Sequence, residues 1–174
     1  MAGKATATAA LFCLLEMLSH AFAGQQFDQL PIPVKRHAEE VRAACRDANS
    51  ELEISYDMAG ISDITIEGQP AFIVDDGELC SPFQSAGVNC SNRGCDLRIW
   101  KRTSNGRWSL ILEEHSRGKF ISATENGTLA ALVITVGALH PQCHPEPDRD
   151  YVARDSCDLL GRYTRGKWRW QRLN

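Results

Sequence analysis

The chain has 174 residues, of which 43% are hydrophobic, and its 19 basic and 22 acidic side chains give a formal net charge of -3. This composition is typical of a globular protein and excludes an intrinsically disordered chain. The mild acidity provides no general attraction to nucleic acid or to an anionic membrane, and no stretch reaches the ~18 apolar residues of a membrane-spanning helix. We therefore expect one domain with no membrane span and no nucleic-acid partner.

The first 23 residues have the pattern of a secretory signal peptide. Lys4 supplies a positive start, residues 5–15 form an uncharged and mostly apolar run, and Ala21 and Ala23 stand where a signal peptidase requires small side chains. An amphipathic helix that stays attached is the alternative interpretation. The pattern predicts cleavage after Ala23 and export of the mature chain.

Six cysteines follow residue 23, and an even number in an exported chain indicates a disulfide framework in an oxidising compartment. Fifteen pairings are open to six cysteines, and the sequence alone does not choose among them. We favour sequential pairing, because the last two bridges then close short loops rich in turn-forming residues. The predicted bridges are Cys45–Cys80, Cys90–Cys95 and Cys143–Cys157. Export of this kind places the protein in the periplasm or outside the cell.

One helix is predicted at the start of the mature domain. Pro31 and Pro33 disfavour a helix before them, so residues 24–33 are expected to be a flexible lead to a single globular domain over residues 34–174. Residues 34–48 have apolar side chains at helical spacing on one face. These are Val34, Ala38, Val41, Cys45 and Ala48.

Beyond the helix the pattern changes to short alternating segments joined by turns. The expected strands are residues 64–66, 71–74, 97–102, 107–113, 119–124, 128–136, 160–164 and 167–172. Three pairs of them flank Asn105-Gly106, Asn126-Gly127 and Arg165-Gly166, which indicates hairpins. Residues 132–136 are nearly all apolar or β-branched, so they predict a central strand covered on both faces. The predicted fold is α+β, an N-terminal helix packed on a mostly antiparallel sheet of hairpins and stabilised by disulfides.

The order of the cysteines resembles that of a group of small exported bacterial proteins of unassigned function. A helix cysteine and a strand pair precede Cys80, and the segment Cys90-Ser-Asn-Arg-Gly-Cys95 leads directly into an alternating strand. The resemblance implies export and a disulfide framework, but no reaction. Members of the group often carry an acidic turn that can hold calcium. The matching residues 66–75 have too few carboxylates for the six to eight oxygen ligands of calcium, so we predict no cofactor.

Two clusters could carry chemistry. His140, Cys143 and His144 lie close together and are of metal-ligating types, but oxidation of Cys143 would remove its thiolate, so an exposed loop is favoured over a metal site. The acidic pairs at residues 75–76 and 113–114, the second followed by His115, lie at predicted strand ends. Adjacent strand residues point to opposite faces, so neither pair forms an acid–base pair by itself, and solvated strand ends are expected.

The C-terminal hairpin carries the most distinctive charge pattern. From Tyr151 onward there are six basic side chains against two acidic ones. The candidate binding strip, named the basic strip below, consists of Arg162, Arg165, Lys167, Trp168, Arg169, Trp170 and Arg172. Alternation places the two tryptophans on one face of the last strand and Lys167 and Arg169 on the other. Tryptophans that cover the core beside a wet basic face are the favoured interpretation, and a binding strip for an anionic envelope polymer or an acidic protein is the alternative.

No catalytic constellation stands out in the sequence. The chain is therefore expected to be an exported binding or structural module of the periplasm or extracellular space. Two alternatives remain open. One is a small cell-envelope hydrolase that uses Glu113, Glu114 or His115, and the other is a metal-binding protein that uses His140 and His144.

Overall fold

A computed structural model describes residues 26–48, 58–80, 89–91, 94–137, 140–143 and 156–173. The predicted signal peptide and His144 lie outside these ranges. None of the helices in the described ranges is long and apolar enough to cross a membrane.

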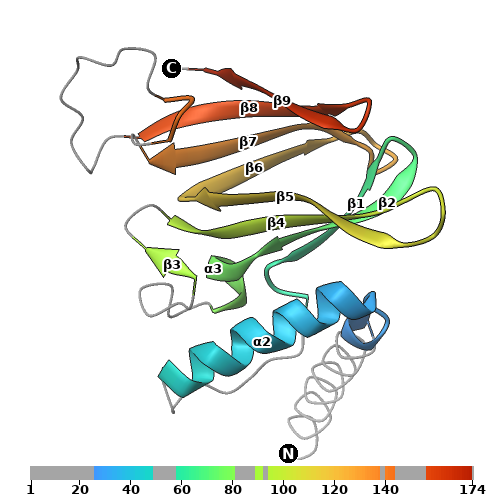
Figure 1. The fold of residues 1–174 in the computed structure, drawn as a ribbon, viewed down its shortest axis with the longest axis vertical. Coiled ribbons are helices and arrows are strands. Elements are labelled where there is room, and N and C mark those ends of the chain that lie inside the picture. Colours follow the sequence, from blue (N-terminus) through green and yellow to red (C-terminus); the bar gives the residue numbers. More distant parts are fainter. Residues whose placement is uncertain are drawn as a thin grey trace, which may run out of the picture.

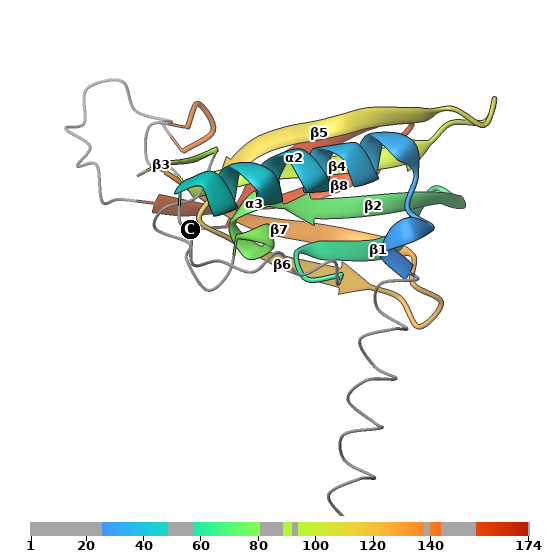
Figure 2. The same cartoon turned by 90° about the horizontal axis from the view of Figure 1, so that it is seen from below.

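Two antiparallel sheets pack face to face, and one helix covers the outer face of the first sheet (Figures 1 and 2). The helix is α2, Ile32–Ala48. The first sheet consists of β1 (Ile61–Ile66), β2 (Gln69–Asp75), β4 (Gly94–Arg102) and β5 (Trp108–Ser116), with the short β3 (Cys90–Ser91) paired to β4. A short helix, α3 (Asp76–Leu79), follows β2. The second sheet consists of β6 (Gly118–Ala123), β7 (Leu129–Gly137), β8 (Ser156–Thr164) and β9 (Lys167–Arg172), in that order.

The predicted fold class is confirmed, since each predicted strand lies within or overlaps an observed one. The turns at Asn105-Gly106, Asn126-Gly127 and Arg165-Gly166 connect β4 to β5, β6 to β7 and β8 to β9. The antiparallel pairing follows from these short connections, because parallel neighbours would need long crossovers.

Two buried clusters hold the layers together. The cluster between the two sheets includes Ile73, Leu97 and Ile99 from the first sheet and Leu132, Ile134, Val136 and Leu159 from the second. The cluster between α2 and the first sheet includes Val34, Ala38, Val41, Cys45, Ile61, Val74 and Leu79. The first sheet is therefore buried on both faces.

The segment before α2 differs from its prediction as a flexible lead. Phe27 and Leu30 are both buried in the cluster between α2 and the first sheet. The Cζ atom of Arg42 lies over the Phe27 ring, 4.8 Å from the centroid of that ring. The helix begins at Ile32. Pro33 is accommodated there, because the first-turn N–H that it lacks has no partner within a helix.

Among the described elements, only one face of the central strand β7 is covered by another layer. It lies between β6 and β8, as predicted, and its inward side chains Leu132, Ile134 and Val136 are at most 1% exposed. The outward side chains Val133 and Thr135 are half-buried. The expectation that both faces are covered is thus not met by the described elements.

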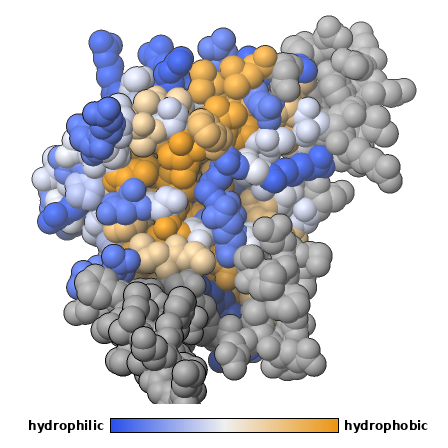
Figure 3. All heavy atoms as spheres, turned by 180° about the vertical axis from the view of Figure 1, so that it is seen from behind, coloured by the Kyte–Doolittle hydropathy of each residue, from blue (hydrophilic) through white to orange (hydrophobic). Residues whose placement is uncertain are grey.

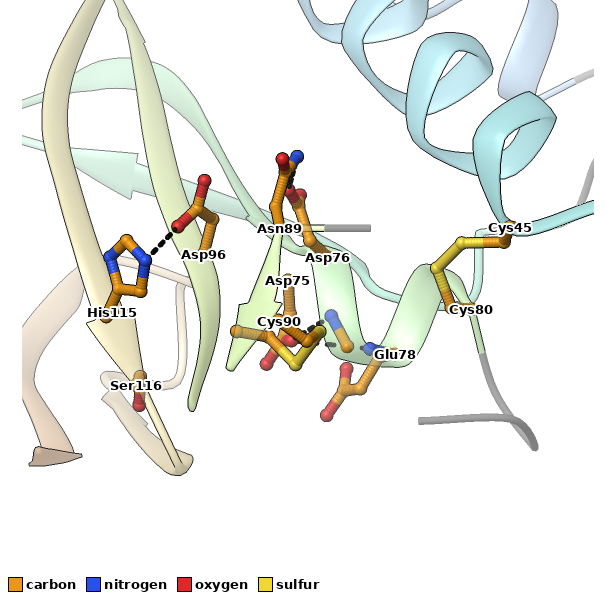
Figure 4. The surroundings of a disulfide bond; sticks show 12 residues. Cys45, Asp75, Asp76, Glu78, Cys80, Asn89, Cys90, Asp96, His115 and Ser116 are labelled. Carbon is orange, nitrogen blue, oxygen red and sulfur yellow. Dashed lines mark hydrogen bonds and ion pairs between the residues drawn. A yellow bond between two sulfur atoms is a disulfide. The ribbon is translucent and has the colours of Figure 1, made fainter. Parts of the chain in front are cut away.

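Three disulfide bonds are present, with the predicted sequential pairing. Cys45–Cys80 joins α2 to the end of α3 (Figure 4). Cys90–Cys95 joins β3 to β4, and Cys143–Cys157 joins a loop to the start of β8. Three bonds in one small domain indicate an oxidising location outside the cytoplasm.

Removal of Cys45–Cys80 by double alanine substitution is expected to cost about 4 kcal/mol of unfolding free energy, because this bond spans 35 residues. The same change at Cys90–Cys95, a separation of 5 residues, should cost about 2 kcal/mol, since it restricts the unfolded chain less. Urea denaturation of both variants measures the difference. Equal losses would show that loop closure does not set the contribution of these bonds.

Candidate functional site

The basic strip lies on the β8–β9 hairpin, whose two-residue turn has an unusual sequence. Arg165 and Gly166 have φ values of 53° and 76°. Two positive φ values in succession are what the right-handed twist of a hairpin requires, and Asn or Gly usually occupies the first position. Arginine is disfavoured in this conformation. Turn formation therefore does not explain the choice of Arg165.

A carboxylate from the first sheet supports this turn. The Arg165 backbone N–H donates to Oε1 of Glu67 at 2.6 Å, and Oε2 of Glu67 accepts from Lys101 Nζ at 2.7 Å. Glu67 itself has a φ of 50° in the β1–β2 turn. The hydrogen bond from Lys101, followed by the one from the Arg165 backbone, lowers the pKa of the Glu67 carboxyl against the opposing effect of burial. Glu67 thus ties the β1–β2 turn to β4 and to the turn that carries Arg165.

The two tryptophans of the basic strip point toward the core, as the favoured interpretation expected. Trp168 and Trp170 stack with ring centroids 5.4 Å apart, and Tyr163 meets Trp168 edge-on at 5.3 Å. Trp168 Nε1 donates to the Ile111 carbonyl of β5 at 3.0 Å. The rings pack against the cluster between the sheets, so they close its edge.

Arg162 and Arg169 lie on the opposite, outward face and, together with Arg165 of the turn, border a groove of about 600 Å³. Arg172 is opposite the buried Leu159 and so shares the face of the two tryptophans. The groove's lining residues are Leu160, Arg162, Thr164, Arg165, Arg169, Trp170 and Gln171. We call this the arginine groove. Among the lining residues that the structure describes there are three guanidinium groups and two neutral hydrogen-bonding side chains, and none of them is acidic. Guanidinium forks suit carboxylate, sulfate or phosphate groups.

Arg162 and Arg169 are directly opposite each other on β8 and β9. Like charges in such cross-strand pairs destabilise a sheet. Within the described ranges, neither residue forms an ion pair with a carboxylate. Arg172 differs from them, because its guanidinium donates to the Cys143 carbonyl at 3.1 Å and so holds the neighbouring loop.

The acidic residues predicted as solvated strand ends behave differently from that prediction. Asp76 is completely buried, and it contacts His37 Nε2 at 2.8 Å, Arg98 Nη1 at 2.8 Å and Asn89 Nδ2 at 2.9 Å. Asp75 accepts from the Gly77 N–H at the start of α3. The prediction was wrong for Asp76 because its partners come from α2 and β4, which are distant in the sequence.

Glu113, Glu114 and His115, the residues of the hydrolase alternative, each contact a different partner. Glu113 pairs with Arg98 at 2.8 Å, His115 Nε2 lies 3.2 Å from Asp96, and Glu114 lies 3.5 Å from His140. Figure 4 shows His115 turned toward Asp96. Burial raises the pKa of Asp96, and the charges of Arg98 and His115 act in the opposite direction. Each acidic residue therefore has a basic partner, and the cluster ties β4, β5, α2 and α3 together.

The metal-site alternative gains no support from the described residues. Cys143 is in a disulfide bond, and His140 contacts Glu114. In the described ranges no three His, Cys, Asp or Glu side chains are placed to hold a metal ion.

Comparison of the chain with family models, curated proteins and solved structures gives no match.

Replacing Glu67 with glutamine is expected to lower stability by at most about 1 kcal/mol at pH 7, because the Glu67 side chain is 37% exposed and water screens its pair with Lys101. The pKa of Glu67 is lowered on folding, so its contribution is present above the unfolded pKa of about 4.3 and lost as the pH falls through the folded value. The difference between the urea midpoints of the two proteins should therefore shrink as the pH is lowered below about 4. The exposed Glu125→Gln serves as control, and a difference independent of pH would contradict the assignment.

Gly161→Ala should destabilise the protein by about 1–3 kcal/mol, because the added Cβ would overlap the ring of Trp170 across the strand pair. Tryptophan fluorescence and thermal unfolding report the displacement. Gly118→Ala is the matched control, since its added Cβ meets nothing within 4 Å. Equal stability of the two variants would show that Trp170 is not closely packed on Gly161.

Proposed function

We propose that this protein is an exported, non-catalytic binding module that holds an anionic partner in the arginine groove, in the periplasm or outside the cell. The signal-peptide pattern, the resemblance to small exported bacterial proteins and the three disulfide bonds support export. The anionic envelope polymer or acidic protein expected from the sequence is the class of partner that this groove suits.

The observation that carries the proposal is the opposition of Arg162 and Arg169. Basic residues on β9 alone would be explained by its position at the edge of the sheet, where charge opposes edge-to-edge pairing. Arg162, however, lies on β8, which is paired on both sides and has no open edge. Protection of an edge therefore does not account for Arg162, whereas an anion between the two guanidinium groups would offset their repulsion.

The geometry of the alternatives is less favourable. In a Ser–His–Asp triad the aspartate contacts Nδ1 and leaves Nε2 to activate the hydroxyl group. Here Nε2 of His115 is the atom that faces Asp96. Among the described contacts of His115 there is no hydroxyl or thiol nucleophile, so the hydrolase alternative lacks its central group.

Arg169→Glu separates a binding role from a structural one. It replaces a repulsive cross-strand pair with an attractive one opposite Arg162, so stability should rise by about 0.2–1 kcal/mol. Retention on immobilised poly-glutamate and on dextran sulfate should fall several-fold, and the salt concentration needed for elution should drop.

The control is Arg107→Glu, which makes the same change in net charge in the exposed β4–β5 turn. It should leave retention close to that of the unchanged protein. Equal loss in both variants would mean that only net charge matters, and unchanged retention of Arg169→Glu would exclude the arginine groove as the binding site.

A further inference from the structure

The outer face of the second sheet carries an apolar row beside the arginine groove. The pairing register places Phe120 of β6 opposite Val133 of β7, and Val133 opposite Leu160 of β8. These three side chains, which we call the apolar row, lie next to one another across three strands. Phe120 is 66% exposed, and the other two are half-buried.

This row lies on the face that the described elements leave open. Figure 3 shows an apolar band, flanked by hydrophilic side chains, on the side of the molecule where β6 lies. The continuous apolar run of β7 is of the kind found in strands covered on both faces. Only its inner face meets the other sheet. The apolar sequence of β7 therefore suits a strand with a second covering layer, which would lie on the outer face of the second sheet.

The arginine pair runs parallel to the apolar row. Leu160 and Arg162 are two residues apart on β8, so the two rows are separated by roughly 7 Å along the strands. Three adjacent strands span roughly 10 Å. An amphipathic helix with apolar residues at i, i+3 or i+4, and i+7 presents a stripe of about the same length.

On the opposite side of the molecule, a helix of this chain covers the outer face of a sheet. On the first sheet, α2 places Val34, Ala38 and Val41 against a strand face that includes Val74. That helix completes the cover of the first sheet, whereas no described helix does so for the second. The free cations of the arginine groove determine the charge that a covering helix would need beside its apolar stripe.

We infer that the outer face of the second sheet docks an acidic amphipathic helix of a partner protein, with its apolar stripe on Phe120, Val133 and Leu160 and its carboxylates on Arg162 and Arg169. This inference rests on the proposed function and narrows it. A purely hydrophilic polyanion would satisfy the arginines but leave the apolar row in water.

The test uses three probes with the purified protein. The first is a fluorescent 18-residue helix-forming peptide with leucines on one face and glutamates beside them. The second has the same composition with its leucines distributed around the helix, and the third is poly-glutamate. Fluorescence anisotropy should show at least tenfold tighter binding of the first probe than of the other two.

Single substitutions then locate the contact. Phe120→Ser should weaken the amphipathic peptide about tenfold and leave poly-glutamate unaffected, because it removes an exposed apolar contact but no charge. Ile32→Ser is the matched control, since Ile32 is 80% exposed on α2 at the other side of the molecule. Thermal midpoints confirm that both variants fold.

Each remaining outcome overturns the inference in a different way. Equal binding of all three probes, insensitive to Phe120→Ser, would keep the anion-binding function and reject the helix. Binding to phosphatidylglycerol–phosphatidylcholine vesicles that depends on Phe120, without binding of the peptide, would make the partner a membrane surface. Failure of every anionic probe would reject the proposed function together with the inference.

Discussion

An apolar sheet face has to be removed from water, and this constraint organises the whole molecule. The first sheet meets it twice, with the second sheet on its inner face and α2 on its outer face. The Cys45–Cys80 bond fastens α2 to the end of α3, so the outer cover stays close to the sheet even when it opens locally. Among the described elements, the second sheet is covered only on its inner face, by the first sheet. The difference between the two sheets is what makes its outer face a surface for binding.

The charged residues divide in the same way. Around Arg98 the carboxylates of Asp76, Asp96 and Glu113 all lie within 2.8 Å of the guanidinium. This paired cluster joins the helices to the first sheet, and each buried carboxylate in it has a basic neighbour, as burial of charge requires. The guanidinium groups of Arg162 and Arg169 are exposed and opposed, without such neighbours in the described ranges. Charges that stabilise the fold are therefore found in pairs, and those left unpaired are available to a ligand.

Much of the fold was predictable because its determinants are local. Hairpins follow from turn sequences such as Asn105-Gly106, the helix from apolar spacing, and the sequential disulfide pairing from short loops between neighbouring elements. The prediction failed where distant segments meet. Phe27 and Leu30 look like a lead in the sequence and become core once α2 supplies Arg42 and the first sheet lies beneath them. Asp76 looks like a strand end, and its burial depends on Arg98, which lies 22 residues away.

Glu67 shows why the binding residues alone do not define the site. In the sequence it is only one of the two carboxylates of residues 66–75, yet it accepts a hydrogen bond from the Arg165 backbone across 98 residues of sequence. The turn that carries Arg165 belongs to the second sheet, whereas the carboxylate that supports it belongs to the first. A guanidinium held on a supported turn loses less freedom on binding than one on a free loop, which favours affinity. The packing of the two sheets is therefore part of the binding site, because a shift between them would move Glu67 away from the turn and release Arg165.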